Sequence, residues 1–181
     1  MERVLVMGGP GAGKSTAAVR VATALGVPLY HLDMLFWQPG WREPRREEFE
    51  GRLARVLAEP AWVVDGNYSW TLPQRLAAAD AVLWLDFPTS TCLRGVLARW
   101  VRFRGRQRPD MAPQCPEKVD RAFLWYVVRW RARHVRPLGR QLAEAASRGV
   151  GVHRVRGREE LERWLGQVAL AAIPGGARHG A

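Results

Sequence analysis

Cysteine is scarce in this chain, and long apolar runs are absent. The two cysteines, Cys92 and Cys115, do not have the spacing of metal ligands, so we expect both to be reduced thiols. No run of apolar residues is long enough to cross a membrane. The first residues have the pattern of a strand rather than that of a signal peptide. Together these features predict a cytoplasmic protein with no membrane partner.

Lysine is also scarce, because arginine supplies nearly all of the positive charge. Lys14 and Lys118 are the only lysines among 28 Lys and Arg residues, and the net charge is +11. Three explanations fit this charge: a nucleic-acid surface, a site for polyanionic nucleotides that uses bidentate guanidinium groups, or an arginine-biased genome. The charge does not choose among them, but it predicts non-specific binding to nucleic acid at low salt.

The most informative stretch is the loop at residues 8–16. Its sequence matches G-x-x-x-x-G-K-[ST] in full, between a strand pattern at 4–7 and a helical pattern at 17–25. Backbone N–H groups of such a loop and of the following helix bind phosphate oxygens. We expect Lys14 to reach the β- and γ-phosphates of ATP, and the Ser15 hydroxyl to hold Mg²⁺. The predicted ATP-binding residues are Gly9, Pro10, Gly11, Ala12, Gly13, Lys14, Ser15 and Thr16.

Two carboxylates follow the next two apolar runs. Asp33 comes after residues 27–32, and Asp65 lies within the run at 61–68. Ligands of open α/β sheets bind at the carboxyl ends of the strands. We therefore expect Asp33 to orient or deprotonate an acceptor or to hold a magnesium-bound water, and Asp65 to be a second magnesium element. The alternatives are a helix or turn cap for Asp33 and a solvent-facing turn for Asp65, while His31 is expected to pack or hydrogen-bond locally.

Residues 34–42 are rich in aromatic and turn residues. They either line an acceptor pocket by stacking or fold onto the core. A short helix at 71–79 carries a further arginine. The predicted acceptor-binding residues are Asp33, Phe36, Trp41, Arg42, Asn67, Tyr68 and Arg75.

Arginine is densest between residues 99 and 108, around Gly105 and before Pro109. A glycine-hinged, arginine-rich segment at about 103–116 is typical of a lid that closes over phosphates and excludes water. A solvated basic loop and a nucleic-acid patch are the alternatives. The predicted catalytic residues are Lys14, Asp33, Arg99, Arg104, Arg106 and Arg108.

Five short apolar strands alternate with helices, which predicts a parallel sheet covered on both faces. With the loop at 8–16, the expected fold is α/β, a three-layer P-loop NTPase fold with an Arg-rich lid. We expect one domain at 1–172 and a disordered tail at 173–181. A long helix is expected from residue 117 to about 136, kinked or ended by Pro137 and continued to 147.

These motifs resemble the nucleoside and nucleotide kinase group of phosphate-loop proteins, of which adenylate kinase is the best-known member. The resemblance is carried by the loop at 8–15, by Asp33-Met34-Leu35, by Asp65-Gly66 and by Leu85-Asp86-Phe87-Pro88. It implies ATP-dependent phosphate transfer, with Arg99 at the position of a phosphate-binding arginine.

The resemblance also has departures. Phe36 and Ser69 stand where adenylate kinase has arginines that contact the acceptor nucleotide. The departures imply an acceptor other than AMP, unless Arg42 or Arg75 replaces those arginines.

A second set of motifs is similar to a bacterial group labelled adenylate-kinase-like or "DNA topology modulation" proteins. That resemblance spans about residues 3–165 and implies a link to DNA supercoiling, although the chain has no helix-turn-helix signature or zinc-ligand spacing. Three hypotheses follow: an ATP-dependent phosphotransferase with a small acceptor, a kinase of a non-nucleotide metabolite, and a nucleotide-dependent DNA-binding protein with little kinase activity. The motifs are His31-Leu32-Asp33, Trp37-x-Pro39-Gly40-Trp41, Trp62–Tyr68, Arg75-Leu76-x-x-Ala79-Asp80 and Arg106-x-Arg108-Pro109-Asp110-Met111.

Overall fold

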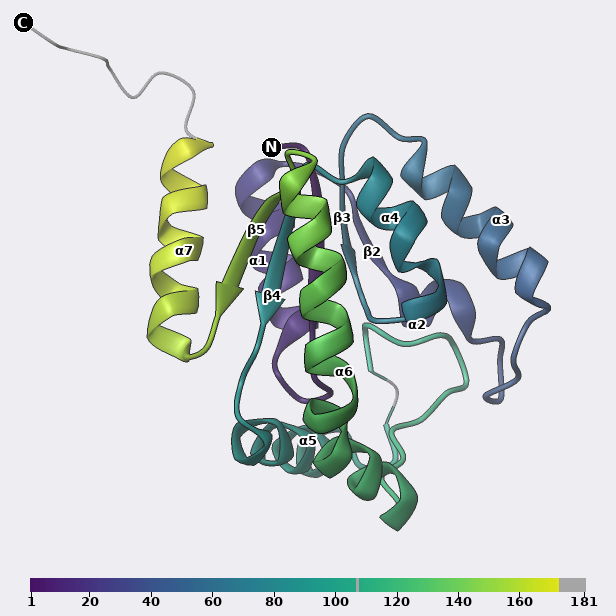
Figure 1. The fold of residues 1–181 in the computed structure, drawn as a ribbon. Coiled ribbons are helices and arrows are strands. Elements are labelled where there is room, and N and C mark those ends of the chain that lie inside the picture. Colours follow the sequence, from purple (N-terminus) through teal and green to yellow (C-terminus); the bar gives the residue numbers. More distant parts are fainter. Residues whose placement is uncertain (107, 173–181) are drawn as a thin grey trace, which may run out of the picture.

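The computed structural model describes residues 1–106 and 108–172 (Figure 1). Five strands form one sheet in the order β2-β3-β1-β4-β5, and every neighbouring pair is parallel. The predicted five-stranded parallel sheet is confirmed, whereas the tail expected at 173–181 lies outside the described residues. The strands are β1 (Arg3–Gly8), β2 (Leu29–His31), β3 (Trp62–Asp65), β4 (Ala81–Leu85) and β5 (Gly151–Val155).

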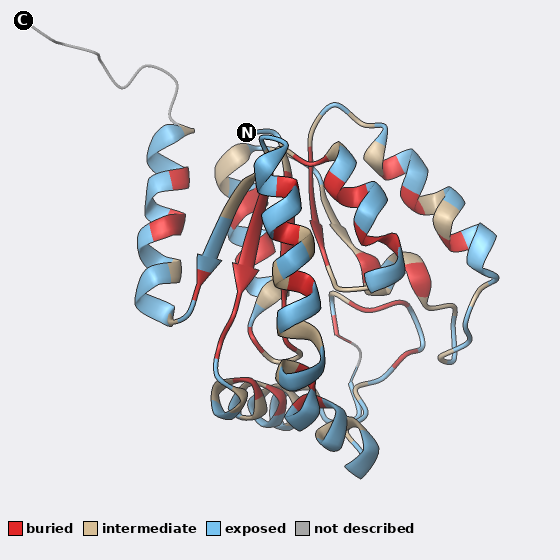
Figure 2. Ribbon diagram, viewed as in Figure 1, coloured by how far each residue is buried: buried red, intermediate tan, exposed pale blue. Residues whose placement is uncertain are grey.

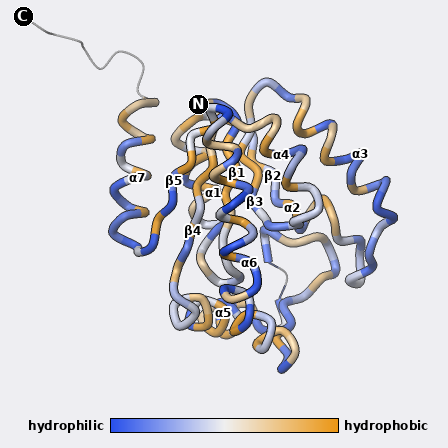
Figure 3. Tube along the Cα trace, in the orientation of Figure 1, coloured by the Kyte–Doolittle hydropathy of each residue, from blue (hydrophilic) through white to orange (hydrophobic). Residues whose placement is uncertain are grey.

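Helices cover both faces of this sheet, because successive residues of a strand point to opposite sides. Val4 and Val6 pack with α1 and α7, while Leu5 and Met7 pack with α3, α4 and α6. The three central strands β1, β3 and β4 are buried, whereas the edge strands β2 and β5 are partly exposed (Figure 2). The outer helices alternate between apolar and polar residues (Figure 3). The helices are α1 (Lys14–Leu25), α2 (Leu32–Phe36), α3 (Arg46–Leu57), α4 (Leu72–Ala78), α5 (Thr89–Phe103), α6 (Arg121–Ser147) and α7 (Arg158–Ala171), with a 3₁₀ turn η1 at Ser69–Thr71.

The strand register brings three strand ends together. Val6 of β1 and His31 of β2 both pair with Asp65, the last residue of β3. The carboxyl ends of β1, β2 and β3 therefore meet at one edge of the sheet, where ligands of open α/β sheets bind.

Helix α6 begins later in the sequence than expected. It begins at Arg121 rather than at Glu117, because the Asp120 carboxylate accepts the backbone N–H of Phe123 at 2.8 Å and caps the helix. It continues through Pro137 to Ser147. Glu117 consequently belongs to the irregular segment before the helix.

Among the described residues, none of the helices is both long and apolar enough to span a membrane.

Candidate functional site

The loop between β1 and α1 lies directly against α5. Gly11 has φ +78° and Gly13 has φ +88°, a backbone region that favours glycine. A Cβ atom at Gly11 would lie 2.1 Å from the carbonyl oxygen of Cys92, and one at Gly95 would lie 2.0 Å from the carbonyl oxygen of Gly11. Gly95 is a residue that the sequence reasoning missed. A glycine inside a helix lowers helix stability by about 1 kcal/mol relative to alanine. A glycine within a predicted helix therefore indicates a close backbone contact, and this signal could have identified Gly95.

Lys14 begins α1 and turns back over this loop. Its ammonium group donates a hydrogen bond to the carbonyl oxygen of Gly9 at 3.0 Å. Burial lowers the pKa of Lys14, while the charges of Asp65 and Asp33 oppose that change. The helix has no side-chain N-cap at Gly13, so its first backbone N–H groups remain available to an anion.

Two carboxylates lie at the ends of β2 and β3. Asp65 is buried, and its Oδ1 lies 2.7 Å from the Nδ1 of His31. Burial alone would lower the pKa of His31, but the hydrogen bond and the charge of Asp65 raise it overall. Asp33 lies on α2 rather than in a strand-end loop, and its Oδ1 accepts the Tyr68 hydroxyl at 2.8 Å. Burial raises the pKa of Asp33, although Tyr68 and Lys14 oppose the shift.

Arg99 and Arg108 reach this site and share one buried carboxylate. Arg99 Nε donates to Glu117 Oε1 at 2.9 Å, and Arg108 Nε lies 3.0 Å from Glu117 Oε2. The side chain of Glu117 is only 4% exposed. Sequence reasoning missed Glu117, because it assigned this residue to the first turn of a helix.

Arg104 and Arg106 do not reach the site. Both are exposed, and neither lines the main cavity. The chain reverses at Gly105, which has φ +69°, and the Arg104 guanidinium lies over the Trp100 ring at 5.0 Å. The structure therefore brings Arg99 and Arg108 together but does not bring Arg104 and Arg106 to the cavity.

The segment expected to be a lid packs over residues 37–42. Met111, Ala112 and Cys115 are buried against Trp37 and Trp41. The Trp41 backbone N–H donates to Cys115 Sγ at 3.4 Å. The thiol of Cys115 is thus part of a packed contact between two loops.

Asp110 joins the same segment to the loop at 8–16. Burial opposes ionisation of Asp110, but Arg108 and a hydrogen bond with Ser15 outweigh it and lower the pKa of the carboxyl. The segment before α6 therefore contacts both the loop at residues 8–16 and the aromatic segment at residues 37–42.

A cavity of about 1230 Å³ lies between these elements and one face of α6. Met7 and Lys14 line it beside the strand ends, and its α6 lining runs from Phe123 to Gln141. The sequence-predicted site residues that line it are Pro10, Lys14, Asp33, Trp41, Asn67, Tyr68, Arg99 and Arg108.

Asn67 has a second contact, with the start of the loop at 8–16. Its Nδ2 donates to the carbonyl oxygen of Gly8 at 2.9 Å, and its Oδ1 lies 3.4 Å from the Gly8 nitrogen. The side chain therefore fixes the end of β1 while one side of it faces the cavity.

Three predicted acceptor residues are not in the cavity wall. Phe36 is buried and packs edge-on against Phe49 at 5.1 Å, since α2 turns its ring into the core. Arg42 is exposed and donates to the carbonyl oxygen of Pro39. The structure therefore places both predicted acceptor residues outside the cavity wall.

Arg75 is the third predicted acceptor residue that does not line the cavity. It is fully buried, and its guanidinium donates to the carbonyl oxygens of Gly66, Asn67 and Tyr68 and to the Thr71 hydroxyl. Burial lowers the pKa of Arg75 to about 9, which leaves the side chain protonated at neutral pH. Arg75 therefore holds the backbone of the loop after β3 and does not contact the cavity.

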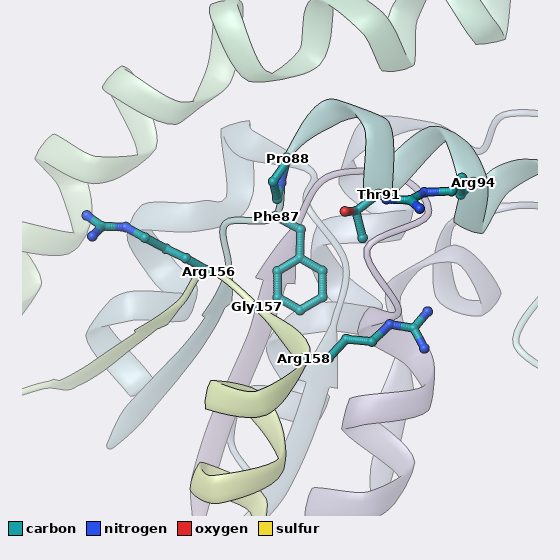
Figure 4. Close-up of a pocket in the computed structure, with 7 residues that line it drawn as sticks. All are labelled: Phe87, Pro88, Thr91, Arg94, Arg156, Gly157 and Arg158. Carbon is teal, nitrogen blue, oxygen red and sulfur yellow. The ribbon is translucent and has the colours of Figure 1, made fainter.

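A second cavity, of about 360 Å³, lies beside the start of α5. Figure 4 shows the Phe87 ring next to Gly157, with Arg94 and Arg158 on one side and Arg156 directed away. Sequence reasoning did not identify it. The lining residues are Phe87, Pro88, Thr91, Arg94, Arg156, Gly157 and Arg158.

Comparison with known proteins shows a shared fold. No family model matches the chain, and no curated protein matches it. Among solved structures, 128 chains match, including the crystal structure of a "putative kinase" from Chloroflexus aurantiacus. The two chains are 16% identical with a TM-score of 0.51, and the match covers 92% of this chain and 96% of the other. This similarity places the chain in the same α/β fold.

Proposed function

We propose that this protein is an ATP-dependent phosphotransferase. The proposal rests on one observation: Lys14, Arg99, Arg108 and Asp33 all line a single cavity at the carboxyl edge of the sheet. Cations that surround a transferring phosphoryl group, with a carboxylate beside the acceptor, are what this reaction requires. The kinase description of the Chloroflexus protein with the same fold agrees with it.

The second cavity suits the nucleoside part of ATP. Thr91 and Arg94 line it from α5, the helix whose Cys92 and Gly95 touch the loop at Gly11. A nucleotide whose phosphates lie on the loop would therefore have its base within reach of Phe87 and Gly157. Arg94 and Arg158 supply cations at the same place (Figure 4).

Calorimetric titration with ATP in the presence of Mg²⁺ tests this donor site. We expect one ATP per chain, in competition with ADP. An absence of binding at millimolar ATP would contradict the proposal.

Mg²⁺ fits this chain as an ion held mainly by phosphate oxygens. Within the described residues, no cluster of three or more His, Cys, Asp and Glu could hold a metal ion, and Mg²⁺ in such enzymes takes few protein ligands. Ser15 offers a hydroxyl at the start of α1, and Asp65 offers a carboxylate that His31 already orients. Bound there, the ion would neutralise phosphate charge.

The remaining residues account for the transfer step. The oxygen of an acceptor hydroxyl forms a bond to the γ-phosphorus, the bond from that phosphorus to the bridging oxygen breaks, and ADP leaves. The hydroxyl proton goes to Asp33. Lys14, Arg99 and Arg108 balance the charge on the phosphoryl oxygens.

The rate of this step is expected to rise with pH as Asp33 ionises. Burial raises the pKa of Asp33 above the ordinary 3.8. The midpoint of the activity loss on acidification should therefore lie at a higher pH than it would for an exposed aspartate. Lys14 and Arg108 favour the carboxylate, and Asp65 disfavours it.

We expect Asp33→Asn to lower kcat by about 10²–10⁴-fold, measured as kcat against pH. A variant with full activity would exclude Asp33 as the base.

Glu117→Gln is expected to lower kcat about tenfold or more, with a smaller change in the KM for ATP. The substitution keeps the size of the side chain but removes the charge that holds Arg99 and Arg108. Steady-state kinetics at several ATP concentrations separate the two parameters. Glu159→Gln, on the exposed face of α7, is the matched control. Equal kinetics for the two variants would show that Glu117 does not position the arginines.

A second candidate function is binding of nucleic acid. Arginines lie over the rings of Trp100 and Trp125 at 5.0 and 4.7 Å, and Trp125 is 58% exposed. Aromatic and arginine side chains of this kind bind single-stranded nucleic acid. Binding that persists at physiological salt and responds to ATP would favour this function, and binding that disappears with salt would exclude it.

A further inference from the structure

We propose that the acceptor is the hydroxyl end of a single-stranded nucleic acid, and that the strand lies along a basic face beside the cavity. This inference rests on the proposed phosphotransferase function and gives it a polymeric acceptor. Three features carry it: the position of the positive charge, the absence of ion pairs among the exposed cations, and the side chains that the face shares with the cavity. The basic face consists of seven exposed cations from the end of α5, from residues 104–120 and from the first half of α6: Arg102, Arg104, Arg106, Lys118, Arg121, Arg129 and Arg133.

The positive charge of the chain is concentrated in one stretch. Residues 87–143 contain 13 Lys and Arg residues and only three Asp and Glu residues, so they carry +10 of the net charge of +11. The rest of the chain is close to neutral, with 15 Lys and Arg residues and 14 Asp and Glu residues. An arginine-biased genome would not keep carboxylates out of one stretch. The charge therefore indicates a polyanionic partner for this part of the molecule.

The cations of the basic face have no carboxylate partners. Within the described residues, Arg99, Arg108 and Arg131 form ion pairs in the stretch at 87–143, and none of the seven cations of the basic face does. Elsewhere, exposed arginines such as Arg20 and Arg46 have carboxylate partners at 2.6 and 2.7 Å. Guanidinium groups without such partners can bind phosphodiester groups in bidentate fashion.

The basic face spans two helices that lie side by side. The backbone N–H of Glu117 donates to the carbonyl oxygen of Arg106 at 3.3 Å, so the end of α5 lies beside the segment that leads into α6 (Figure 1). On α6, the Arg129 guanidinium lies over the exposed ring of Trp125 at 4.7 Å. A strand that crosses this face thus meets cations for its phosphates and aromatic surface for its bases.

Three side chains belong both to the exposed surface and to the cavity. Lys118 and Arg133 are exposed cations that line the cavity, and Tyr126, which is 40% exposed, lines it from α6. They mark the side from which the end of a strand would reach Asp33. The phosphodiester groups that follow would stay at the cations outside. The terminal base of a single strand is free to enter, whereas the terminal base of a duplex would first have to unpair.

Transfer to this acceptor follows the step proposed above. The oxygen of the terminal hydroxyl forms a bond to the γ-phosphorus of ATP, the bond from that phosphorus to the bridging oxygen breaks, and ADP leaves. The hydroxyl proton goes to Asp33, and the product is a strand with a terminal phosphate monoester. A free nucleoside would present the same hydroxyl but would leave the basic face unused. We therefore expect the strand to be the better acceptor.

The acceptor is tested by transfer of label from γ-labelled ATP, with Mg²⁺ and at physiological salt, to a single-stranded oligonucleotide of about 12 nucleotides, a length that one single-strand site can cover. We expect a labelled strand when both ends carry hydroxyls, no label when both ends carry phosphates, and a kcat/KM at least about tenfold above that of the matching nucleosides. A nucleoside that is as good an acceptor overturns this inference and leaves the phosphotransferase proposal intact. A strand that binds without being labelled overturns it as well, and so do phosphatidylglycerol vesicles that bind in place of the strand. ATP titration of the same samples reports on the donor site independently.

The double variant Arg102→Ala with Arg129→Ala tests the basic face. Neither arginine lines the cavity. We expect the KM for the oligonucleotide to rise about tenfold or more and to depend less steeply on salt, with the KM for ATP unchanged. The matched control is Arg20→Ala with Arg46→Ala, which removes the same charge from exposed ion pairs outside the cavity. Equal oligonucleotide KM values for the two double variants would overturn the role of the basic face.

Discussion

Lys14→Ala is expected to lower kcat for phosphate transfer by at least about 10³-fold while the protein stays folded. The ammonium group now rests on the carbonyl oxygen of Gly9 at 3.0 Å, which places it over the loop where the donor phosphates would bind. Removing it takes away a fixed positive charge that faces the transferring group. The fold should be unaffected, because within the described residues the lysine donates a single hydrogen bond, to the carbonyl oxygen of Gly9 at the edge of the site.

Arg20→Ala is the matched control for this variant. Arg20 lies on the same helix, and its exposed guanidinium pairs with Glu162 at 2.6 Å, away from the cavity. We expect less than a twofold change in kcat for Arg20→Ala, and far-UV circular dichroism like that of the unmodified protein for both variants. Full turnover in Lys14→Ala would contradict the role of the loop.

Arg75→Ala is expected to destabilise the protein by about 3 kcal/mol or more. The substitution leaves the carbonyl oxygens of Gly66, Asn67 and Tyr68 without their buried donor and opens a cavity beneath them. For a protein of this size, that loss lowers Tm by roughly 6–12 °C. Asn67 and Tyr68 position Gly8 and Asp33, so the remaining folded protein should also have reduced activity.

Thermal unfolding followed by circular dichroism measures this effect. Arg46→Ala, which removes an exposed pair with Glu50 on α3, should cost less than about 0.5 kcal/mol. If Arg75→Ala and Arg46→Ala unfold at the same temperature, the guanidinium of Arg75 is not the support that its contacts indicate.

The sheet and the loop at 8–16 could be predicted because their signals are local. The central strands β1, β3 and β4 are short apolar runs, and the loop pattern specifies the strand before it and the helix after it. Asp65 was placed correctly for the same reason, since it ends such a run. The start of α6 could not be placed as well, because the capping choice between Glu117 and Asp120 depends on what each side chain contacts.

The arginines show where sequence reasoning stops. Arg75, Arg99 and Arg104 look alike in the sequence, yet one is buried under a loop, one faces the cavity and one is exposed. Long-range partners decide among these outcomes. Glu117 lies 18 residues from Arg99, and no local pattern links the two.

The most direct test of the central claim uses γ-labelled ATP, Mg²⁺ and a mixture of nucleosides. The acceptors also include nucleoside monophosphates, single-stranded oligonucleotides and hydroxylated metabolites, so that the test does not depend on one acceptor class. We predict a labelled product derived from an acceptor, formed in equal amount to ADP by the unmodified protein and absent with Lys14→Ala. Slow ADP release that no acceptor changes, with no labelled small-molecule product, would contradict the phosphotransferase account and favour a nucleotide-regulated binding protein.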